Sequence, residues 1–296
     1  MNMSEPIKNR FDFVILFDVK NGNPNGDPDT GNMPRMDPET GIGLVTDACL
    51  KRKIRNYVDT LKNEQPGYKI YIRQGVPLET SDKSALEYLG VEDLKGAKKT
   101  DPQIEAKIRD FMCQNFFDIR TFGAVMTTFT KAALNCGQVR GPVQLGMARS
   151  IDPITAQEIT LTRNAITTVK DAAEKTTEMG RKYIVPYGLY QVEGYIASVI
   201  AKKVTKFSED DLKLFWQAII NMFENDHSAA RGNMAVRELI VFKHDSYLGN
   251  APSYKLFDRI HVAKKDGVVA PRNYSDYNVT VDTEDLPEGV TCERLI

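Results

Sequence analysis

The sequence predicts an α+β protein in which helices cover one face of an antiparallel sheet. Two observations predict it. Apolar, β-branched and aromatic runs of strand length alternate with amphipathic stretches of helical period, and their order is strand, helix, strand, then helix and strands again. A ferredoxin-like β-α-β-β-α-β core with long insertions fits this order, although the spacing alone does not establish that topology. The length of 296 residues allows one elaborated domain or two smaller ones.

The first strand is expected over residues 11–19 (FDFVILFDV), where nearly every side chain is apolar, β-branched or aromatic. It ends at residues 20–28 (KNGNPNGDP), a segment made almost wholly of turn formers. The sequence therefore predicts a buried strand that opens into a polar loop.

A basic amphipathic helix is expected from about residue 44 to about residue 61. Its apolar stripe consists of Leu50, Ile54, Tyr57, Val58 and Leu61. Lys51, Arg52 and Arg55 follow one another around the neighbouring side, which we expect to face solvent. Thr46 or Asp47 can cap the helix, whose free N–H groups favour an anion there. A capped N-terminus followed by cations one and two turns later suits a row of phosphates.

The middle of the chain predicts an insertion between core elements. Residues 68–72 alternate like a strand, and residues 79–110 are charged and helix-prone with a loose centre at 95–102, which indicates a surface insertion. An amphipathic helix is expected over 104–117, and Gly123 suggests a turn or a close backbone approach. Residues 141–150 predict another core strand, entered through a Gly-Pro turn.

Residues 154–186 do not have the pattern of a buried strand. The segment is rich in Thr, Ile and Val, then polar, and it carries basic residues with a few small or apolar ones near its tip. We therefore expect a projecting two-stranded arm, followed by a mixed apolar strand over 187–200. Ser208 predicts a helix cap, with Asp211 as a weaker substitute for the usual Glu, before a helix over 210–224. Further strands are expected at 237–243, 256–262 and 277–281.

Composition limits the class of protein. The net charge is −1, so any positively charged surface for nucleic acid must be local. The four cysteines, Cys49, Cys113, Cys136 and Cys292, contain no C-x-x-C pair, which argues against zinc and a disulfide framework and fits a reducing cytosol. The first residues have no apolar signal region and no run has membrane-spanning length, so we expect a cytoplasmic protein with no membrane partner.

The sequence contains no phosphate-loop, dinucleotide, zinc-protease or serine-hydrolase motif, and we expect no cofactor, no metal and no catalytic residue. The three histidines lack ligand spacing and are expected to be surface or packing residues. One alternative remains open. Asp18, Asp27 and Asp29 could hold Mg²⁺ for phosphodiester cleavage, although aspartates in such turns usually bond to their own backbone.

Other basic residues lie at the ends of elements or in extended segments. They are Arg120, Arg149, Arg163, Lys170, Arg181 and Arg231. In such positions guanidinium groups and loop amides can follow a single-stranded backbone. The alternative for the helix cations is a solvated face in which Arg55 pairs with Asp59.

Four motifs together resemble a known family. They are NGNPNGDP after the first strand, Thr46-Asp47-x-x-Leu50-Lys51-Arg52-x-x-Arg55, FDIRTFGA at 117–124 and GPVQLGMARS at 141–150. They resemble the repeated backbone subunit of type I CRISPR surveillance complexes (Cascade), and most of all the subtype I-C branch of that RAMP-superfamily subunit.

The resemblance implies a right-hand-like subunit: one RRM-like domain over 1–296 with a modified RRM palm, a surface helical insertion at 79–110 and a thumb hairpin at 151–186. It further implies that copies line up head to tail along one CRISPR guide RNA beside other Cascade subunits. By the same resemblance, the guide is expected to pair with target DNA, and each thumb to displace one nucleotide at regular intervals.

The resemblance also implies an RNA-binding set for this chain. It comprises Asn21, Asn23, Asn25, Thr46, Lys51, Arg52, Arg55, Arg120, Arg149, Arg163, Lys170, Met179, Arg181 and Arg231, with Met179 as the apolar wedge of the thumb. The glycine-rich C-terminal loop of the RNA-processing relatives is missing, which counts against cleavage of the guide precursor. Three hypotheses therefore remain: a non-catalytic guide holder, a metal-dependent ribonuclease using Asp18, Asp27 or Asp29, and a binding module whose basic helix is merely solvated.

Overall fold

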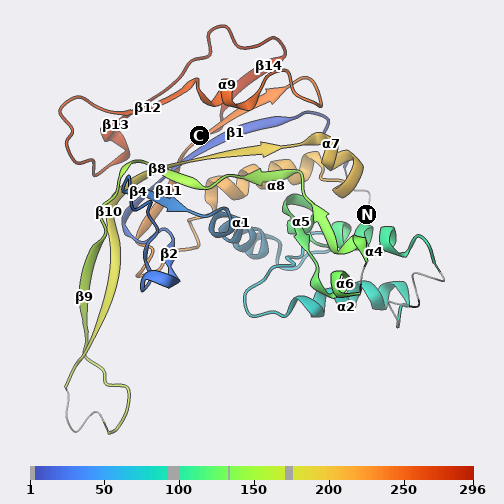
Figure 1. The fold of residues 1–296 in the computed structure, drawn as a ribbon, viewed down its shortest axis with the longest axis horizontal. Helices are drawn as coiled ribbons and strands as arrows, with labels where there is room; N and C mark the ends of the chain where they lie inside the picture. Colours follow the sequence, from blue (N-terminus) through green and yellow to red (C-terminus); the bar gives the residue numbers. More distant parts are fainter. Residues whose placement is uncertain (1–3, 93–95, 97–100, 133, 171–175) are drawn as a thin grey trace.

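The computed structural model describes residues 4–92, 96, 101–132, 134–170 and 176–296. Its centre is a curled eight-stranded antiparallel sheet with the strand order β14-β11-β1-β10-β8-β4, and β7 and β9 also pair with β10 (Figure 1). The strands are β1 (Phe11–Gly22), β4 (Ile42–Val45), β7 (Val143–Leu145), β8 (Ala148–Pro153), β9 (Gln157–Arg163), β10 (Glu178–Ile196), β11 (Asn233–His244) and β14 (Val290–Arg294). Among the described residues, no helix has the length and hydropathy needed to cross a bilayer.

Strand β1 lies between β10 and β11 and is buried on both faces of the sheet. Phe13, Ile15 and Phe17 pack toward one face, whereas Val14 and Leu16 pack toward the other. Burial on both sides explains why the run is continuously apolar and does not alternate. The predicted strand is confirmed and continues three residues further, to Gly22.

Two long helices cover the first face: α1 (Asp47–Lys62) and α8 (Glu209–Asn221). Leu50, Ile54 and Val58 of α1 are fully buried there, as the apolar stripe predicted, and Tyr57 is partly buried. Leu61 is 47% exposed, so its place in the predicted stripe was wrong. The helix begins at Asp47, because Leu44 and Val45 belong to β4 and pair with β8. The predicted start at residue 44 was therefore too early. Ser208 caps α8 in a capping box with Asp211, as expected.

The second face is covered by α9 (Ser253–Phe257) and by a ribbon of β12 (Ile260–Lys264) and β13 (Tyr277–Val281). The strand predicted over 256–262 was partly wrong, since α9 extends to Phe257 before β12 begins. Strand β14 was not predicted, because its alternation is short and mostly polar.

A helical insertion has a small core of its own. It contains α2 (Leu78–Leu89), α4 (Ile104–Asn115), α5 (Phe117–Phe122), β5 (Gly123–Val125), α6 (Thr127–Lys131), the short turn η2 (Asn135–Gly137) and β6 (Gln138–Arg140). The strand predicted over 68–72 was wrong: Lys69 makes one isolated bridge to Phe116. Gly123 has φ 79°, and a Cβ there would lie 2.1 Å from the Val139 carbonyl oxygen, so the expected close approach is present. Of the predicted loose centre, residues 95 and 97–100 lie outside the described residues.

A two-stranded arm projects from the sheet (Figure 1). Strand β9 pairs with the first part of β10, from Glu178↔Arg163 to Ile184↔Gln157, and from Val185 onward β10 pairs with β1. One strand thus serves both arm and sheet. It ends at Ile196, short of the predicted residue 200, where α7 (Ser198–Ile200) and the π-helical turn η4 (Ala201–Thr205) follow. The strand predicted over 141–150 is split into β7 and β8 at Gly146 and Met147.

Candidate nucleic-acid interface

A polar hollow of about 270 Å³ lies where β1 ends, α1 begins and β11 starts. It is lined by Asn23, Pro24, Asn25, Gly26, Asn32, Cys49, Arg52, Lys53, Ala230 and Arg231. The structure thus brings together four residues predicted from sequence, Asn23, Asn25, Arg52 and Arg231. We call this site the loop–helix hollow.

The loop after β1 is held in place by its own backbone and amide groups. It contains the short elements β2 (Gly26–Asp27), η1 (Pro28–Thr30) and β3 (Met33–Pro34). The Asn23 amide N donates to the Ala230 carbonyl across 2.8 Å, and its side-chain Nδ2 donates to the Asn32 carbonyl across 2.7 Å. Asn23 Oδ1 is buried and has no hydrogen-bond partner in the described part of the chain. A buried acceptor without a donor is rare.

Asn25 and Thr46 connect the loop to the helix cap. Asn25 Oδ1 accepts hydrogen bonds from the Thr46 amide and from the Thr46 hydroxyl, both across 3.0 Å. The Thr46 hydroxyl in turn accepts from the Cys49 amide, as the sequence predicted for a cap. Asn21 lies just before this loop with φ 53°. The remaining amide N–H groups at the start of α1 therefore sit beside a fixed polar loop.

The cations near the hollow differ in availability. Arg52 is exposed and makes no ion pair within the described residues. Lys53 is buried and pairs with Asp226. Arg231 Nε lies 2.9 Å from the same carboxylate and donates to the Asp226 backbone carbonyl across 2.6 Å. Lys51 pairs with Asp47 across 2.9 Å. Sequence reasoning missed Lys53. It lies three residues after Leu50 and four before Tyr57, on the side of the helix where only apolar residues were expected.

Arg55 is not on the solvent face, contrary to the prediction. Its Nε donates to Asp118 Oδ2 across 2.8 Å, and both side chains are buried. Asp118 also accepts from the backbone amides of Tyr71 and Ile72. The alternative pairing of Arg55 with Asp59 was wrong as well, since Asp59 instead faces Arg73 across 3.1 Å.

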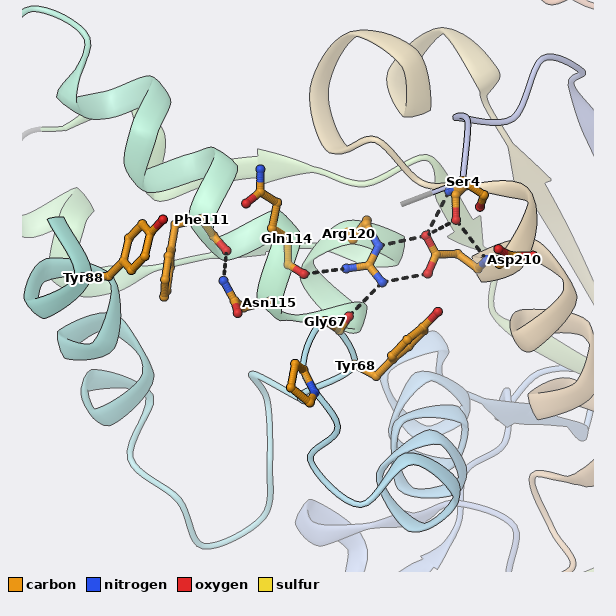
Figure 2. Close-up of a pocket in the computed structure, with 12 residues that line it drawn as sticks. Ser4, Gly67, Tyr68, Tyr88, Phe111, Gln114, Asn115, Arg120 and Asp210 are labelled. Atoms are coloured by element: carbon orange, nitrogen blue, oxygen red, sulfur yellow. Dashed lines mark hydrogen bonds and ion pairs between the residues drawn. The ribbon is translucent and has the colours of Figure 1, made fainter. Parts of the chain in front are cut away.

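Arg120 is also buried, at the side of a separate pocket of about 590 Å³ (Figure 2). Its Nε and Nη2 donate to Asp211 across 2.8 and 2.7 Å, and its remaining N–H groups donate to the carbonyls of Cys113, Gln114 and Gly67. Every guanidinium donor is thus occupied within the chain. We therefore leave Arg55 and Arg120 out of the candidate RNA-binding surface.

The other predicted cations lie away from the hollow. Arg149 is 3.5 Å from Asp37 at the edge formed by β4 and β8. On the arm, Arg163 pairs with Glu178, Arg181 lies 3.2 Å from Glu158, and Lys170 is exposed. Met179 is 76% exposed, as an apolar wedge would require.

The base of the arm adjoins the loop–helix hollow. Lys182 Nζ donates to the Ala229 carbonyl across 3.0 Å, next to the hollow's Ala230. In the ribbon view, β2 lies between the arm base and α1 (Figure 1). A chain of phosphates in the hollow would therefore pass the arm.

The aspartates of the nuclease hypothesis are engaged separately. Asp18 pairs with Arg237 across 3.0 Å, and Asp27 caps η1 and lies 3.4 Å from Arg35. Asp29 donates its backbone N–H to Asp27. Within the described ranges, no three His, Cys, Asp or Glu side chains are grouped as a metal ion would need.

The thiol nearest the hollow is not activated. Burial raises the pKa of Cys49, although the positive charges of Lys53 and Arg52 act in the opposite direction. The thiol is therefore protonated near neutral pH, and a nucleophilic role needs the thiolate. The hollow offers hydrogen-bond donors, an Asn23 oxygen with no partner among the described residues, and positive charge, which is the chemistry of phosphate and sugar contacts.

A family model described as CRISPR-associated protein Cas7 matches residues 9–282. The chain belongs to the Cas7 family. A CRISPR-associated protein Cas7 from Haloferax volcanii is 26% identical over 234 residues, which cover 72% of this chain and 65% of that protein. The match thus spans less than two thirds of the relative's length.

Chains in solved CRISPR structures are similar at lower identity. One, described as a CRISPR RNA-guided surveillance complex, pre-nicking, has a TM-score of 0.49 at 13% identity, covering 79% of this chain and 78% of that one. Another, from a Type III-B Cmr-beta complex bound to cognate target RNA, has a TM-score of 0.42 at 11% identity, covering 79% and 61%.

Proposed function

We propose that this Cas7-family chain is a non-catalytic backbone subunit that binds CRISPR guide RNA in a type I-C Cascade complex. Copies polymerise head to tail along the guide, contact other Cascade subunits and present the guide for pairing with target DNA. The observation that carries the proposal is the loop–helix hollow. There, Arg52 is exposed and a buried Asn23 oxygen has no partner among the described residues, and the arm's Lys182 bonds to Ala229 next to the hollow.

The chemistry of the hollow suits a guide holder that ignores sequence. Such a protein must grip phosphates and 2′-hydroxyls and leave the base edges free to pair. Arg52 and the amides at the start of α1 supply contacts to phosphate. Asn23 Oδ1 is an acceptor, and a 2′-hydroxyl is a donor that could satisfy it. Asn25 and Thr46 hold the loop that aligns these groups, and Asn21 lies just before this loop.

The arm is the proposed thumb, over residues 151–186. It folds over the RNA, its cations Arg163, Lys170 and Arg181 face the backbone, and Met179 displaces one nucleotide. Arg149 extends the cationic surface at the β4–β8 edge. The ion pairs of Arg163 and Arg181 within the arm are exposed, and exposed pairs are weak enough to exchange for phosphate.

The core is proposed to be the modified ferredoxin-like or RRM palm within one domain over 1–296, with 79–110 as its surface insertion. The supporting observation is the strand order β11-β1-β10-β8, with α1 between β1 and β8 along the chain and α8 between β10 and β11. This is the β-α-β-β-α-β order, interrupted by the helical insertion and the arm.

Head-to-tail stacking suits the charge of the chain. The net charge of −1 lets identical copies approach without strong mutual repulsion. An interface in which one surface of a copy meets a different surface of the next extends into a filament. The metal-dependent ribonuclease remains the alternative, and Asp18→Ala, Asp27→Ala and Asp29→Ala test it through divalent-dependent RNA cleavage.

The experiment is to express the chain with a CRISPR array and its companion subunits, and to measure particle size and the 260/280 absorbance ratio before and after ribonuclease. A large nucleic-acid-rich particle with RNA protected at regular intervals supports the proposal. A protein-only monomer or dimer from the same cells contradicts it.

A further inference from the structure

A second cationic pocket lies on the opposite face of the sheet from α1. It has a volume of about 330 Å³ and is lined by Asp18, Lys20, Tyr187, Arg237, Arg272, Asn273, Tyr274 and Ser275. Three cations share it with one carboxylate. We call it the ribbon pocket, because residues 272–275 lead into β13 of the β12–β13 ribbon.

Arg237 enters this pocket because of a β-bulge. Leu16 of β1 pairs with Glu238 of β11, but the next residue, Phe17, pairs with Val236, so Arg237 is the extra residue. Strict alternation along β11 would place Val236 on the same face as Glu238. Val236 instead packs against the core on the helix face. Arg237 therefore shares the ribbon face with Glu238. Bulges of this kind re-aim a side chain and are common next to functional sites.

The re-aimed guanidinium is held from two sides. Arg237 Nε lies 3.0 Å from Asp18 Oδ1, and Asp18 Oδ2 accepts from the Tyr187 hydroxyl across 3.2 Å. The guanidinium also lies over the Tyr274 ring, 6.0 Å from its centroid. The Arg237 side chain nevertheless stays 42% exposed, so part of its guanidinium group is open to the pocket that it lines. Asp18 acts here as a positioning residue for Arg237.

The other two cations are not neutralised. Lys20 Nζ donates to Asn273 Oδ1 across 3.2 Å, and Arg272 Nη1 donates to the Pro271 carbonyl. Neither makes an ion pair with a described residue, and both are exposed. The nearby carboxylate of Glu238 is already paired with Arg294. The pocket thus has an excess of positive charge and adjacent tyrosines, a combination that suits a nucleotide phosphate.

The ribbon pocket is close to the loop–helix hollow. Lys20 and Asn23 are three residues apart, so their Cα atoms are separated by at most about 11 Å. Between them the chain crosses the end of β1, where Gly232 packs against Asn21; a Cβ on Gly232 would lie 2.4 Å from the Asn21 carbonyl oxygen. The two sites therefore lie on opposite faces of the same sheet end.

We infer that the ribbon pocket binds a phosphate of the same RNA strand that occupies the loop–helix hollow, so that the strand wraps around the end of β1 and β11. This inference rests on the proposed function and adds to it Lys20, Arg237 and Arg272 as RNA-contacting residues.

The test compares four full-length proteins by fluorescence anisotropy with a labelled single-stranded RNA over a series of salt concentrations. They are the wild type, Lys20→Ala/Arg272→Ala, Arg52→Ala, and Lys255→Ala as a control. Lys255 is an exposed cation of α9 that lines neither site. The substituted residues are exposed, and equal melting temperatures verify that all four proteins fold.

We expect the double variant to bind RNA about tenfold more weakly than Lys255→Ala, since it lacks two donors of charged hydrogen bonds. The slope of log K against log salt should fall by about 0.7 for each phosphate that the variant no longer binds. If Arg52→Ala is weakened but the double variant equals Lys255→Ala, the inference is overturned and the proposed function stands. If the wild type shows no salt-dependent RNA binding, both are overturned.

Discussion

Arg55 of α1 and Asp118 of α5 form a buried ion pair, 2.8 Å from Nε to Oδ2, that connects the sheet-covering helix to the helical insertion. The carboxylate completes its hydrogen bonds with the amides of Tyr71 and Ile72, which fixes the connecting loop as well. A residue expected to bind phosphate is thus part of the junction between two hydrophobic cores.

Arg55→Ala should therefore lower stability. Removing one partner leaves Asp118 buried without its counter-charge, which costs about 3 kcal/mol in the free energy of unfolding. Thermal and urea unfolding measure this loss, and Arg52→Ala, three residues away on the exposed side, is the matched control that should unfold like the wild type. If Arg55→Ala keeps wild-type stability but loses RNA affinity, Arg55 contacts RNA and the structural assignment is contradicted.

Arg52→Ala should weaken RNA binding for all sequences alike, because a phosphate contact carries no base information. Its slope of log K against log salt should be smaller by about 0.7. Binding to a homopolymer and to a mixed-sequence RNA is measured in parallel, with Lys213→Ala of α8 as the control. A loss restricted to one RNA sequence would contradict the phosphate-holding role.

Met179→Ala should leave the assembled particle intact but reduce displacement of the nucleotide under the arm. An apolar side chain inserted between neighbouring bases unstacks them, so its loss should affect only the site of insertion and not assembly. The fluorescence of 2-aminopurine, placed at each guide position in turn, reports the unstacked site. Thr162→Ala, at the cross-strand neighbour of Met179, is the control. An unchanged fluorescence pattern in Met179→Ala would exclude it as the wedge, and Val169, 93% exposed near the arm tip, would be tested next.

Asp82→Asn should stabilise the protein near neutral pH. Burial raises the pKa of Asp82, an effect that the hydroxyls of Thr128 and Tyr71 oppose and the charge of Glu79 reinforces. Because the folded pKa exceeds the unfolded value of about 3.9, the stability from this carboxyl is present below that pH and is lost as pH rises through the folded pKa. The melting temperature of Asp82→Asn should exceed that of the wild type at pH 7, and the advantage should disappear near pH 3.

Asp37 provides a control of opposite sign. Hydrogen bonds from the Glu39 amide and the Thr40 hydroxyl lower its pKa. Its contribution is therefore present above the unfolded pKa and is lost as pH falls through the folded pKa. Asp37→Asn should lower the melting temperature at pH 7 and have less effect in acid. Two variants with the same sign of pH dependence would contradict this assignment.

Local patterns predicted the elements whose signal lies within a few residues. The apolar stripe of α1, the Thr46 cap and the Ser208–Asp211 capping box are short-range features, and the structure has all three, except that Leu61 of the stripe is exposed. The pairing of Arg120 with Asp211 spans 91 residues and that of Arg55 with Asp118 spans 63. No short motif reports such a partner, so these arginines could not be distinguished from Arg52 by sequence.

The same limit applies to the ribbon pocket. A β-bulge depends on how two strands pair, and residues 233–244 alone do not show that Arg237 is the extra residue. The segment 68–72 failed for a related reason. It alternates like a strand, but no neighbouring strand pairs with it among the described residues. Its single bridge is from Lys69 to Phe116, at the end of α4.

Strand β10 runs without a break from the arm into the centre of the sheet, so no loop separates this strand of the arm from the sheet. Force on its tip passes along a single covalent backbone to the hydrogen bonds shared with β1. The angle at which the arm projects is therefore set by the twist of the sheet. In a stack of identical copies, every arm would then project from its subunit at the same angle, and the arms would be evenly spaced along the stack.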